Sequence, residues 1–87
     1  MKFLDSHVFL QDKFSVGVEE STGKYYISIP VANPYVSYEE YYEIERAQYE
    51  ACPGNLEELR KLAEKCRERM NDENIMMIPG ELRGDPI

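Results

Sequence analysis

Two runs of alternating residues separated by a short polar loop constrain the fold of this chain more than any other feature. The inward-facing positions of both runs are apolar or aromatic: Phe14, Val16, Val18, Tyr25, Ile27, Ile29 and Val31. A period of two residues is that of a β-strand with one face against a core. The loop, residues 20–23, ends in Gly23, which adopts a positive φ without steric cost. The sequence therefore predicts an antiparallel hairpin whose second strand spans residues 24–31.

The segments that flank this hairpin are also extended in character. Residues 7–10 (HVFL) are rich in β-forming residues and precede a turn-like QDK segment, so they predict a further strand. Pro30 cannot donate a backbone hydrogen bond, so either the second hairpin strand ends there or the amide side of Pro30 faces an edge. Residues 32–34 (ANP) predict a turn, because a residue before proline avoids helical geometry.

The segment from residue 37 to residue 51 supports two interpretations. As a helix, it begins with Ser37 as the N-cap and Glu40 as the third helical residue, which together form a capping box. The strand interpretation has Tyr38, Glu40, Tyr42 and Ile44 on one face and Glu39, Tyr41 and Glu43 on the other. The first of these faces points to the core. In that case the Glu40 carboxylate must find hydrogen-bond donors, or its pKa must rise.

The residues SIPVANPYVSYEEYYEIE within this region resemble a segment of small uncharacterised bacterial proteins. In those proteins a Tyr-Glu-Glu-Tyr-Tyr-Glu-Ile run forms a strand that leads into a short helix. The resemblance covers only the middle of the chain and implies no activity. It favours a strand followed by a short helix over one continuous helix.

A helix over residues 56–70 is the firmest predicted element. Pro53 and Gly54 interrupt the chain, and Asn55 follows them as the N-cap, with glutamates in the first turn where they suit the helix dipole. The apolar stripe of this helix consists of Leu56, Leu59, Leu62, Ala63, Cys66 and Met70. The predicted fold is therefore α+β: a small antiparallel sheet of three to four strands, with this C-terminal helix packed on one face.

The length of 87 residues suits one small domain with a single core. Residues 75–78 (IMMI) predict a short strand or an apolar arm, which Pro79 and Gly80 end. We assign residues 1–80 to a single domain and residues 81–87 (ELRGDPI) to a flexible C-terminal tail. The Arg-Gly-Asp triplet in that tail matches an adhesion sequence, which we interpret as coincidence.

The charge of the chain restricts its partners. Seventeen acidic residues against ten basic ones give a net charge of −7. This sign opposes nucleic-acid binding, because that affinity comes largely from Lys and Arg contacts to phosphates. The same field speeds the encounter with a basic protein. No stretch approaches the roughly 20 apolar residues of a membrane helix. We expect neither a nucleic-acid partner nor a membrane.

The N-terminal residues predict the compartment. Residues 1–14 have an interrupted apolar run and no small-residue cleavage site, unlike a secretory signal. Cys52 and Cys66 fit no metal-binding or redox spacing, and Cys66 lies on the apolar stripe. We therefore expect a cytoplasmic protein with reduced thiols.

No catalytic or metal-binding motif is recognisable. His7 is the only histidine, and no acid or nucleophile stands at a useful spacing from it. The acidic segment follows no known metal-ligand spacing, although it contains Glu39, Glu40, Glu43, Glu45 and Glu50. We predict that the protein is not an enzyme and uses no cofactor and no metal.

The tyrosine- and glutamate-rich segment is the candidate partner-binding site. Tyrosine rings bury large areas at interfaces, and carboxylates select a basic partner. The residues assigned to the site are Tyr38, Glu39, Glu40, Tyr41 and Glu43. The leading hypothesis is a non-enzymatic protein-interaction module, such as an immunity-type inhibitor that docks on a basic protein; this is an analogy from size and charge. The alternatives are a homodimeric or larger homo-oligomeric structural domain, and a small ligand-binding or enzymatic domain that uses Glu and Tyr side chains.

Overall fold

The computed structural model describes residues 2–77 and 83–87. Its antiparallel sheet has four main strands in sequence order: β1 (Phe3–Phe9), β2 (Phe14–Glu19), β3 (Tyr25–Ala32) and β4 (Ser37–Ile44). The remaining elements are the helices α1 (Arg46–Ala51) and α2 (Leu56–Arg67), the 3₁₀ turn η1 (Asp72–Asn74) and the short strand β5 (Asp85–Pro86), which pairs with β3. The predicted α+β fold is confirmed. Among the described residues, no helix has both the length and the apolar character that a membrane crossing requires.

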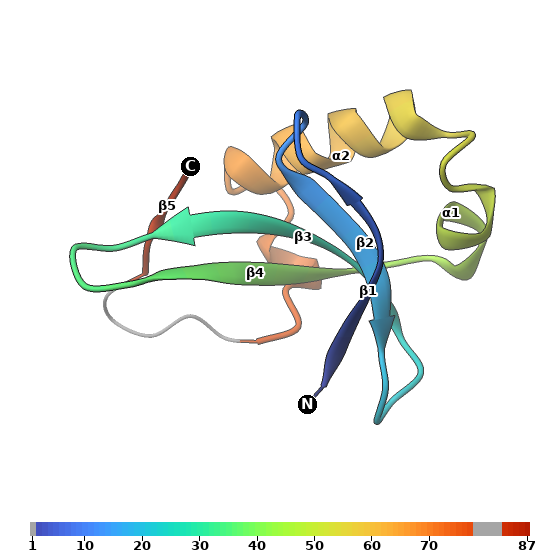
Figure 1. Cartoon of the computed structure of the whole chain (residues 1–87), viewed down its shortest axis with the longest axis horizontal. Coiled ribbons are helices and arrows are strands. Elements are labelled where there is room, and N and C mark those ends of the chain that lie inside the picture. Colours follow the sequence, from blue (N-terminus) through green and yellow to red (C-terminus); the bar gives the residue numbers. More distant parts are fainter. Residues whose placement is uncertain (1, 78–82) are drawn as a thin grey trace.

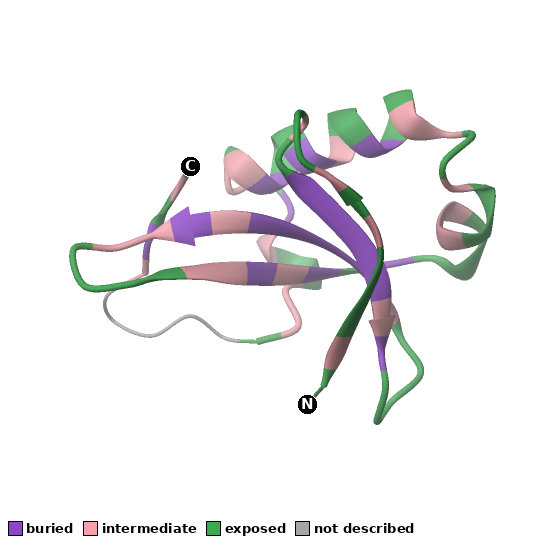
Figure 2. Cartoon of the chain, viewed as in Figure 1, coloured by how far each residue is buried: buried purple, intermediate pink, exposed green. Residues whose placement is uncertain are grey.

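The sheet has one face against the helices and one face that they leave uncovered (Figure 1). We call the first the helix face; its core residues pack with the inner side of α2. The core consists of Phe14, Val16, Ile27, Ile29, Val31, Tyr42, Ile44, Leu59, Ala63 and Cys66. Figure 2 shows the buried residues concentrated on β2, β3 and the inner side of α2. The buried residues of α2 recur at intervals of four and three positions, which confirms the predicted apolar stripe except at Met70.

The predicted hairpin is confirmed as β2 and β3, which pair from Ser15 opposite Ser28 to Val18 opposite Tyr25. Gly23 has a φ of +73°, as the loop requires. The carboxylate of Glu19 stabilises this loop by accepting hydrogen bonds from the hydroxyls and backbone N–H groups of residues 21 and 22 and from the N–H of Lys2. These donors hold the pKa of Glu19 well below its usual range, and the hydrogen bonds from Ser21 contribute most to this effect.

The strand predicted at residues 7–10 begins earlier and ends one residue sooner, as β1 (Phe3–Phe9). β1 pairs with β2 over its whole length, but the register shifts between Asp5 and His7. Such an irregularity places an extra residue in one strand and interrupts the alternation from which a strand is recognised. The N-terminal half of β1 was missed for that reason.

The segment from residue 37 to residue 51 forms a strand, β4, followed by a short helix, α1. This confirms the interpretation as a strand and then a helix, and the interpretation as one continuous helix is wrong. β4 pairs with β3 from Ser37 to Ile44, so alternation along a paired strand outweighs the helix-start pattern at Ser37. The capping box is found instead at α1, where the Gln48 side chain accepts a hydrogen bond from the N–H of Glu45 at 2.8 Å. β3 continues past Pro30 and ends at Ala32. Its pairing with β2 ends before Pro30, at Ser28.

The helix α2 begins as predicted and ends at Arg67, three residues before the predicted end at Met70. Arg69 has a φ of +61°. The N–H of Arg69 donates to the carbonyl of Cys66, and the N–H of Met70 donates to the carbonyl of Lys65. This pair of bonds is the Schellman arrangement that ends a helix. Met70 consequently leaves the apolar stripe and is 67% exposed.

The C-terminal residues 83–87 are packed against the sheet, in contrast to the loose tail predicted for residues 81–87. Asp85 and Pro86 pair with Ala32 and Val31 of β3. Residues 81 and 82 lie outside the described residues, as does Ile78 of the predicted IMMI strand. Within the described part of this segment, Ile75 forms an isolated antiparallel bridge with Tyr42, and the N–H of Met76 donates to the carbonyl of Tyr41 at 2.8 Å.

Candidate functional site

The structure divides the five predicted site residues between the two faces of the sheet. Tyr38 and Glu40 point to the helix face, whereas Glu39, Tyr41 and Glu43 point to the opposite one, because successive side chains of a strand alternate. The five residues therefore form no single surface. Each face has a different chemistry.

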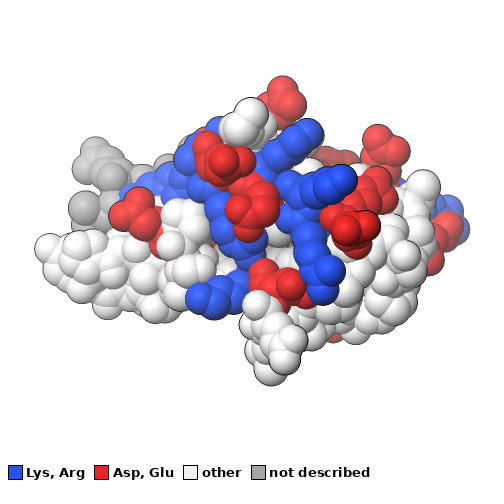
Figure 3. All heavy atoms as spheres, turned by 90° about the horizontal axis from the view of Figure 1, so that it is seen from above, with Lys and Arg blue, Asp and Glu red and all other residues white. Residues whose placement is uncertain are grey.

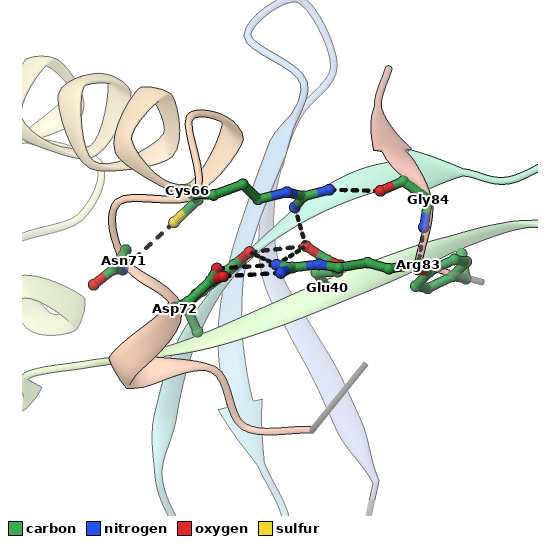
Figure 4. Close-up of polar contacts among 9 residues, drawn as sticks. Glu40, Cys66, Asn71, Asp72, Arg83 and Gly84 are labelled. Carbon is green, nitrogen blue, oxygen red and sulfur yellow. Dashed lines mark hydrogen bonds and ion pairs between the residues drawn. The ribbon is translucent and has the colours of Figure 1, made fainter. Parts of the chain in front are cut away.

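On the helix face, Glu40 is 4% exposed and fully supplied with hydrogen-bond donors. Its carboxylate accepts bonds from Arg69 Nη1 at 2.5 Å, from Arg83 Nε at 2.7 Å and from the Tyr42 hydroxyl at 2.8 Å (Figure 4). Burial acts to raise the pKa of Glu40, but the bonds from Arg83 and Tyr42 and the charges of both arginines outweigh it, so the pKa lies below its ordinary value of 4.5. Of the two outcomes expected for this carboxylate, the structure shows that it has found donors.

Arg83 joins Glu40 to a second carboxylate, that of Asp72. Its guanidinium donates to the two oxygens of Asp72 at 2.8 and 2.9 Å while it also contacts Glu40. Arg69 donates to the carbonyl of Gly84 at 2.5 Å. We call Glu40, Asp72, Arg69 and Arg83 the arginine cluster. It has two positive and two negative charges and joins β4, the end of α2, η1 and the C-terminal residues.

The arginine cluster is a structural network that ties the C-terminal residues to β3 and β4. The N–H of Gly84 donates to the Tyr38 hydroxyl at 2.7 Å. A Cβ atom on Gly84 would lie 2.6 Å from the carbonyl carbon of Ala32, so only glycine fits against β3. In the Arg-Gly-Asp triplet, Arg83 is therefore paired within the fold and Gly84 is buried.

The outer surface of α2 carries charges of both signs. Seen from above the helix, basic and acidic side chains are interspersed (Figure 3). Arg60 pairs with Asp12 at 3.0 Å, and Arg67 pairs with Glu64 at 2.5 Å. Two of its arginines are therefore held by acids within the described part of the chain.

The opposite side of the sheet, which we call the open face, is covered by neither α1 nor α2. Its residues, identified by strand pairing and contacts, are Phe3, Asp5, Val8, Ser15, Tyr26, Ser28, Pro30, Glu39, Tyr41 and Glu43. β1 and β4 are the two ends of the strand order, yet the rings of Phe3 and Tyr41 stack with centroids 3.7 Å apart. The sheet therefore coils strongly enough to bring β1 over this face. As a result Tyr26 is fully buried between them without a helix above it.

Among the described residues, two carboxylates of the open face accept hydrogen bonds from hydroxyl groups alone. The Tyr26 hydroxyl donates to Asp5 at 2.6 Å, and the Ser28 hydroxyl donates to Glu39 at 3.2 Å. Within residues 2–77 and 83–87, no Lys or Arg nitrogen lies within 4.0 Å of either carboxylate. Burial raises the pKa of Glu39 above 4.5, and the negative charge of Asp5 adds to the rise.

A groove of about 330 Å³ runs beside these carboxylates. Its lining combines apolar and charged side chains: Asp5, Val8, Phe9, Leu10, Lys13, Phe14, Ser15, Pro30 and Glu39. Val8 and Leu10 are 55% and 83% exposed, although both are large and apolar. The register shift after Asp5 brings Val8 to the same face as Asp5, which is how β1 supplies both acidic and apolar lining.

Sequence reasoning identified Glu39 and missed the rest of this groove. Asp5 precedes the strand predicted at residues 7–10, so it was not considered as part of the sheet. The alternation of Phe3 and Asp5 with Leu4 is too short a pattern to identify the strand by itself. Glu43, the fifth predicted residue, lies outside the groove and pairs with Lys24 at 3.6 Å.

No group of three or more His, Cys, Asp or Glu side chains suited to a metal ion is found in the described part of the chain. Comparison with known proteins adds no relative: no protein-family model matches this sequence, and no curated protein or solved structure is detectably similar to it.

Proposed function

We propose that this chain is a non-enzymatic protein-interaction module that docks on a basic protein through the open face of its sheet. The observation that carries the proposal is the half-buried carboxylate of Glu39, which has a hydroxyl donor and no cation within ion-pair distance among the described residues. A partly buried anion without a cation costs free energy. A basic group of a partner would remove that cost on binding.

The distribution of arginines within the molecule supports this choice of face. Glu40 has two arginines around it, while its neighbour Glu39 has none. On the outer surface of α2, Arg60 pairs with Asp12 and Arg67 pairs with Glu64. A net charge of −7 additionally steers a basic protein toward this chain, because the summed field raises the encounter rate.

A small enzyme is the second candidate, and one observation favours it. Glu39 lies near Asp5 beside a groove, and its pKa is raised. A carboxyl group with a raised pKa beside a second carboxyl group is an arrangement that general acid–base catalysis uses. The two candidates differ in what they require of the charge: a docking site needs Glu39 ionised, whereas a general acid needs it protonated.

The test is to capture partners from an extract of the organism that encodes the chain and to measure the dissociation constant of each purified partner. We expect a basic protein whose affinity falls as salt concentration rises, since screening weakens contacts between exposed charges. Glu39→Gln should weaken binding more than Glu43→Gln, which removes the same charge outside the groove. A partner that is not basic, or equal effects of the two substitutions, would contradict the proposal.

A further inference from the structure

We propose that the groove on the open face receives one arginine side chain of the partner, with its guanidinium between Asp5 and Glu39 and its aliphatic stem against Val8, Leu10 and Pro30. This inference rests on the proposed function and names the contact through which the basic partner is recognised. Three features of the groove support it: its charges, its apolar lining and a matching arrangement elsewhere in the molecule.

The charges of the groove suit a single cation that contacts two acids. Asp5 and Glu39 line the same groove, and the negative charge of Asp5 acts to raise the pKa of Glu39. Their hydroxyl donors come from residues that are fully or almost fully buried, since Tyr26 is 0% and Ser28 is 1% exposed. The donors hold the carboxylates in position before a ligand arrives, which reduces the ordering cost of binding.

The apolar lining suits the stem of a long basic side chain. Val8 and Leu10 contribute exposed aliphatic surface to the groove. The other apolar lining residues are Phe9, Phe14 and Pro30. Arginine buries its methylene groups along apolar surface while its charged head stays with polar groups. A compact cation without a stem would leave this surface exposed to water.

The helix face shows how this fold accommodates an arginine between two acids. Arg83 reaches Glu40 and Asp72 at the same time, with contacts of 2.7 Å to the first and 2.8 Å to the second. A guanidinium presents five donors in one plane and so can contact two carboxylates together, whereas an ammonium is a point charge. On the open face the pair of acids is present and the arginine must come from outside the described chain.

Lys13 provides an independent check, because it is the basic residue in the groove lining. In the described structure it forms no ion pair with Asp5 or Glu39. Its side chain is exposed, and its positive charge opposes the entry of a second cation. Lys13→Gln should therefore strengthen arginine binding, which a substitution that only damaged the fold would not do.

The experiment is an NMR titration of the ¹⁵N-labelled chain with three blocked tripeptides, Gly-Arg-Gly, Gly-Lys-Gly and Gly-citrulline-Gly. We expect saturable shifts of the amide signals of Val8, Leu10 and Glu39 with the arginine peptide, smaller ones with lysine and none with neutral citrulline. Asp5→Asn and Glu39→Gln should each weaken arginine binding about tenfold, as the loss of a charged hydrogen bond implies. The matched control Glu43→Gln should leave the affinity unchanged, and spectra without peptide establish that each variant is folded.

Several outcomes would overturn the proposal. Equal shifts with arginine and citrulline would show that charge is not recognised, and shifts spread over the acidic surface would show that the groove is not the site. If the arginine peptide fails to bind while a captured basic protein still depends on Glu39, the groove proposal is wrong and the proposed function survives. If the peptide binds in the groove but captured proteins ignore Glu39→Gln, the proposed function fails, and the claim that a partner's arginine occupies the groove fails with it.

Discussion

Glu39 and Glu40 are consecutive residues of β4, yet their carboxylates lie on opposite faces of the sheet and have opposite electrostatic surroundings. Glu40 lies between Arg69 and Arg83 in the arginine cluster, which holds its pKa below 4.5 although burial acts against this. Glu39 has one hydroxyl donor, and burial raises its pKa. The alternation of a strand thus produces one carboxylate that stabilises the fold and one that is available to a partner.

Replacing Glu40 with glutamine should lower the free energy of unfolding by about 3 kcal/mol at pH 7, because it removes the anion that pairs with Arg69 and one of the two anions that pair with Arg83. The folded-state pKa of Glu40 is lowered, so its contribution is present above the unfolded value near 4.5 and is lost as pH falls through the folded pKa. Urea denaturation from pH 7 to pH 3 measures this. A difference between wild type and variant that stays constant over that range would contradict the prediction.

Replacing Glu39 with glutamine should raise the melting temperature at pH 7. The folded-state pKa of Glu39 is raised, so the stability that its protonated form contributes is present below 4.5 and is lost as pH rises through the folded pKa. Glutamine stays neutral throughout, so the gain over wild type should be larger at pH 7 than at pH 4. Calorimetry at the two pH values measures it, with Glu43→Gln as the control. A lower melting temperature at pH 7 would mean that Glu39 stabilises the fold in its charged form.

Two leucines of α2 should differ in their contribution to stability. Leu59 has no exposed surface, whereas Leu62 is half-buried at the edge of the core. Leu59→Ala should cost about 2 to 5 kcal/mol, and Leu62→Ala about half as much, because less apolar surface is removed from contact. Chemical denaturation of both variants provides the comparison. Equal losses would show that the helix is rotated from the position described.

Arg69 has two roles that a pair of substitutions can separate. Its guanidinium bonds Glu40, and its backbone has a φ of +61°, which is unfavourable for residues other than glycine. Arg69→Ala and Arg69→Gly both remove the ion pair, but glycine relieves the backbone strain. The alanine variant should therefore be less stable than the glycine variant by about 1 kcal/mol. Identical unfolding free energies would show that the backbone conformation at this residue changes once the ion pair is absent.

The two cysteines, both free, should react with thiol reagents at different rates in the folded protein. Burial raises the pKa of Cys66 to about 11, and this thiol has no exposed surface. Cys52 is half-buried, and burial raises its pKa as well. Because the thiolate is the reactive form, Cys52 should label first and Cys66 only as the protein unfolds. In urea both should react without prior reduction; protection until a reductant is added would disprove the prediction of reduced thiols.

The features that the sequence predicted correctly are those with a local period. The β2–β3 hairpin, the stripe of α2 and the two faces of β4 each follow from the spacing of neighbouring residues, because period and burial are coupled within one element. The same reasoning identified Glu40 as a core carboxylate in need of donors and placed Glu39 on the opposite face of the strand.

The identity of those donors required the tertiary structure. Arg83 lies 43 positions after Glu40, in a segment whose polar composition predicts a loose end, and no local pattern relates the two. Asp5 likewise approaches Glu39 only because the sheet coils and β1 changes register, which depends on the packing of all four main strands. Alternation along β4 determined which carboxylate faces which side, and long-range packing decided that one of them has two arginines and the other has none.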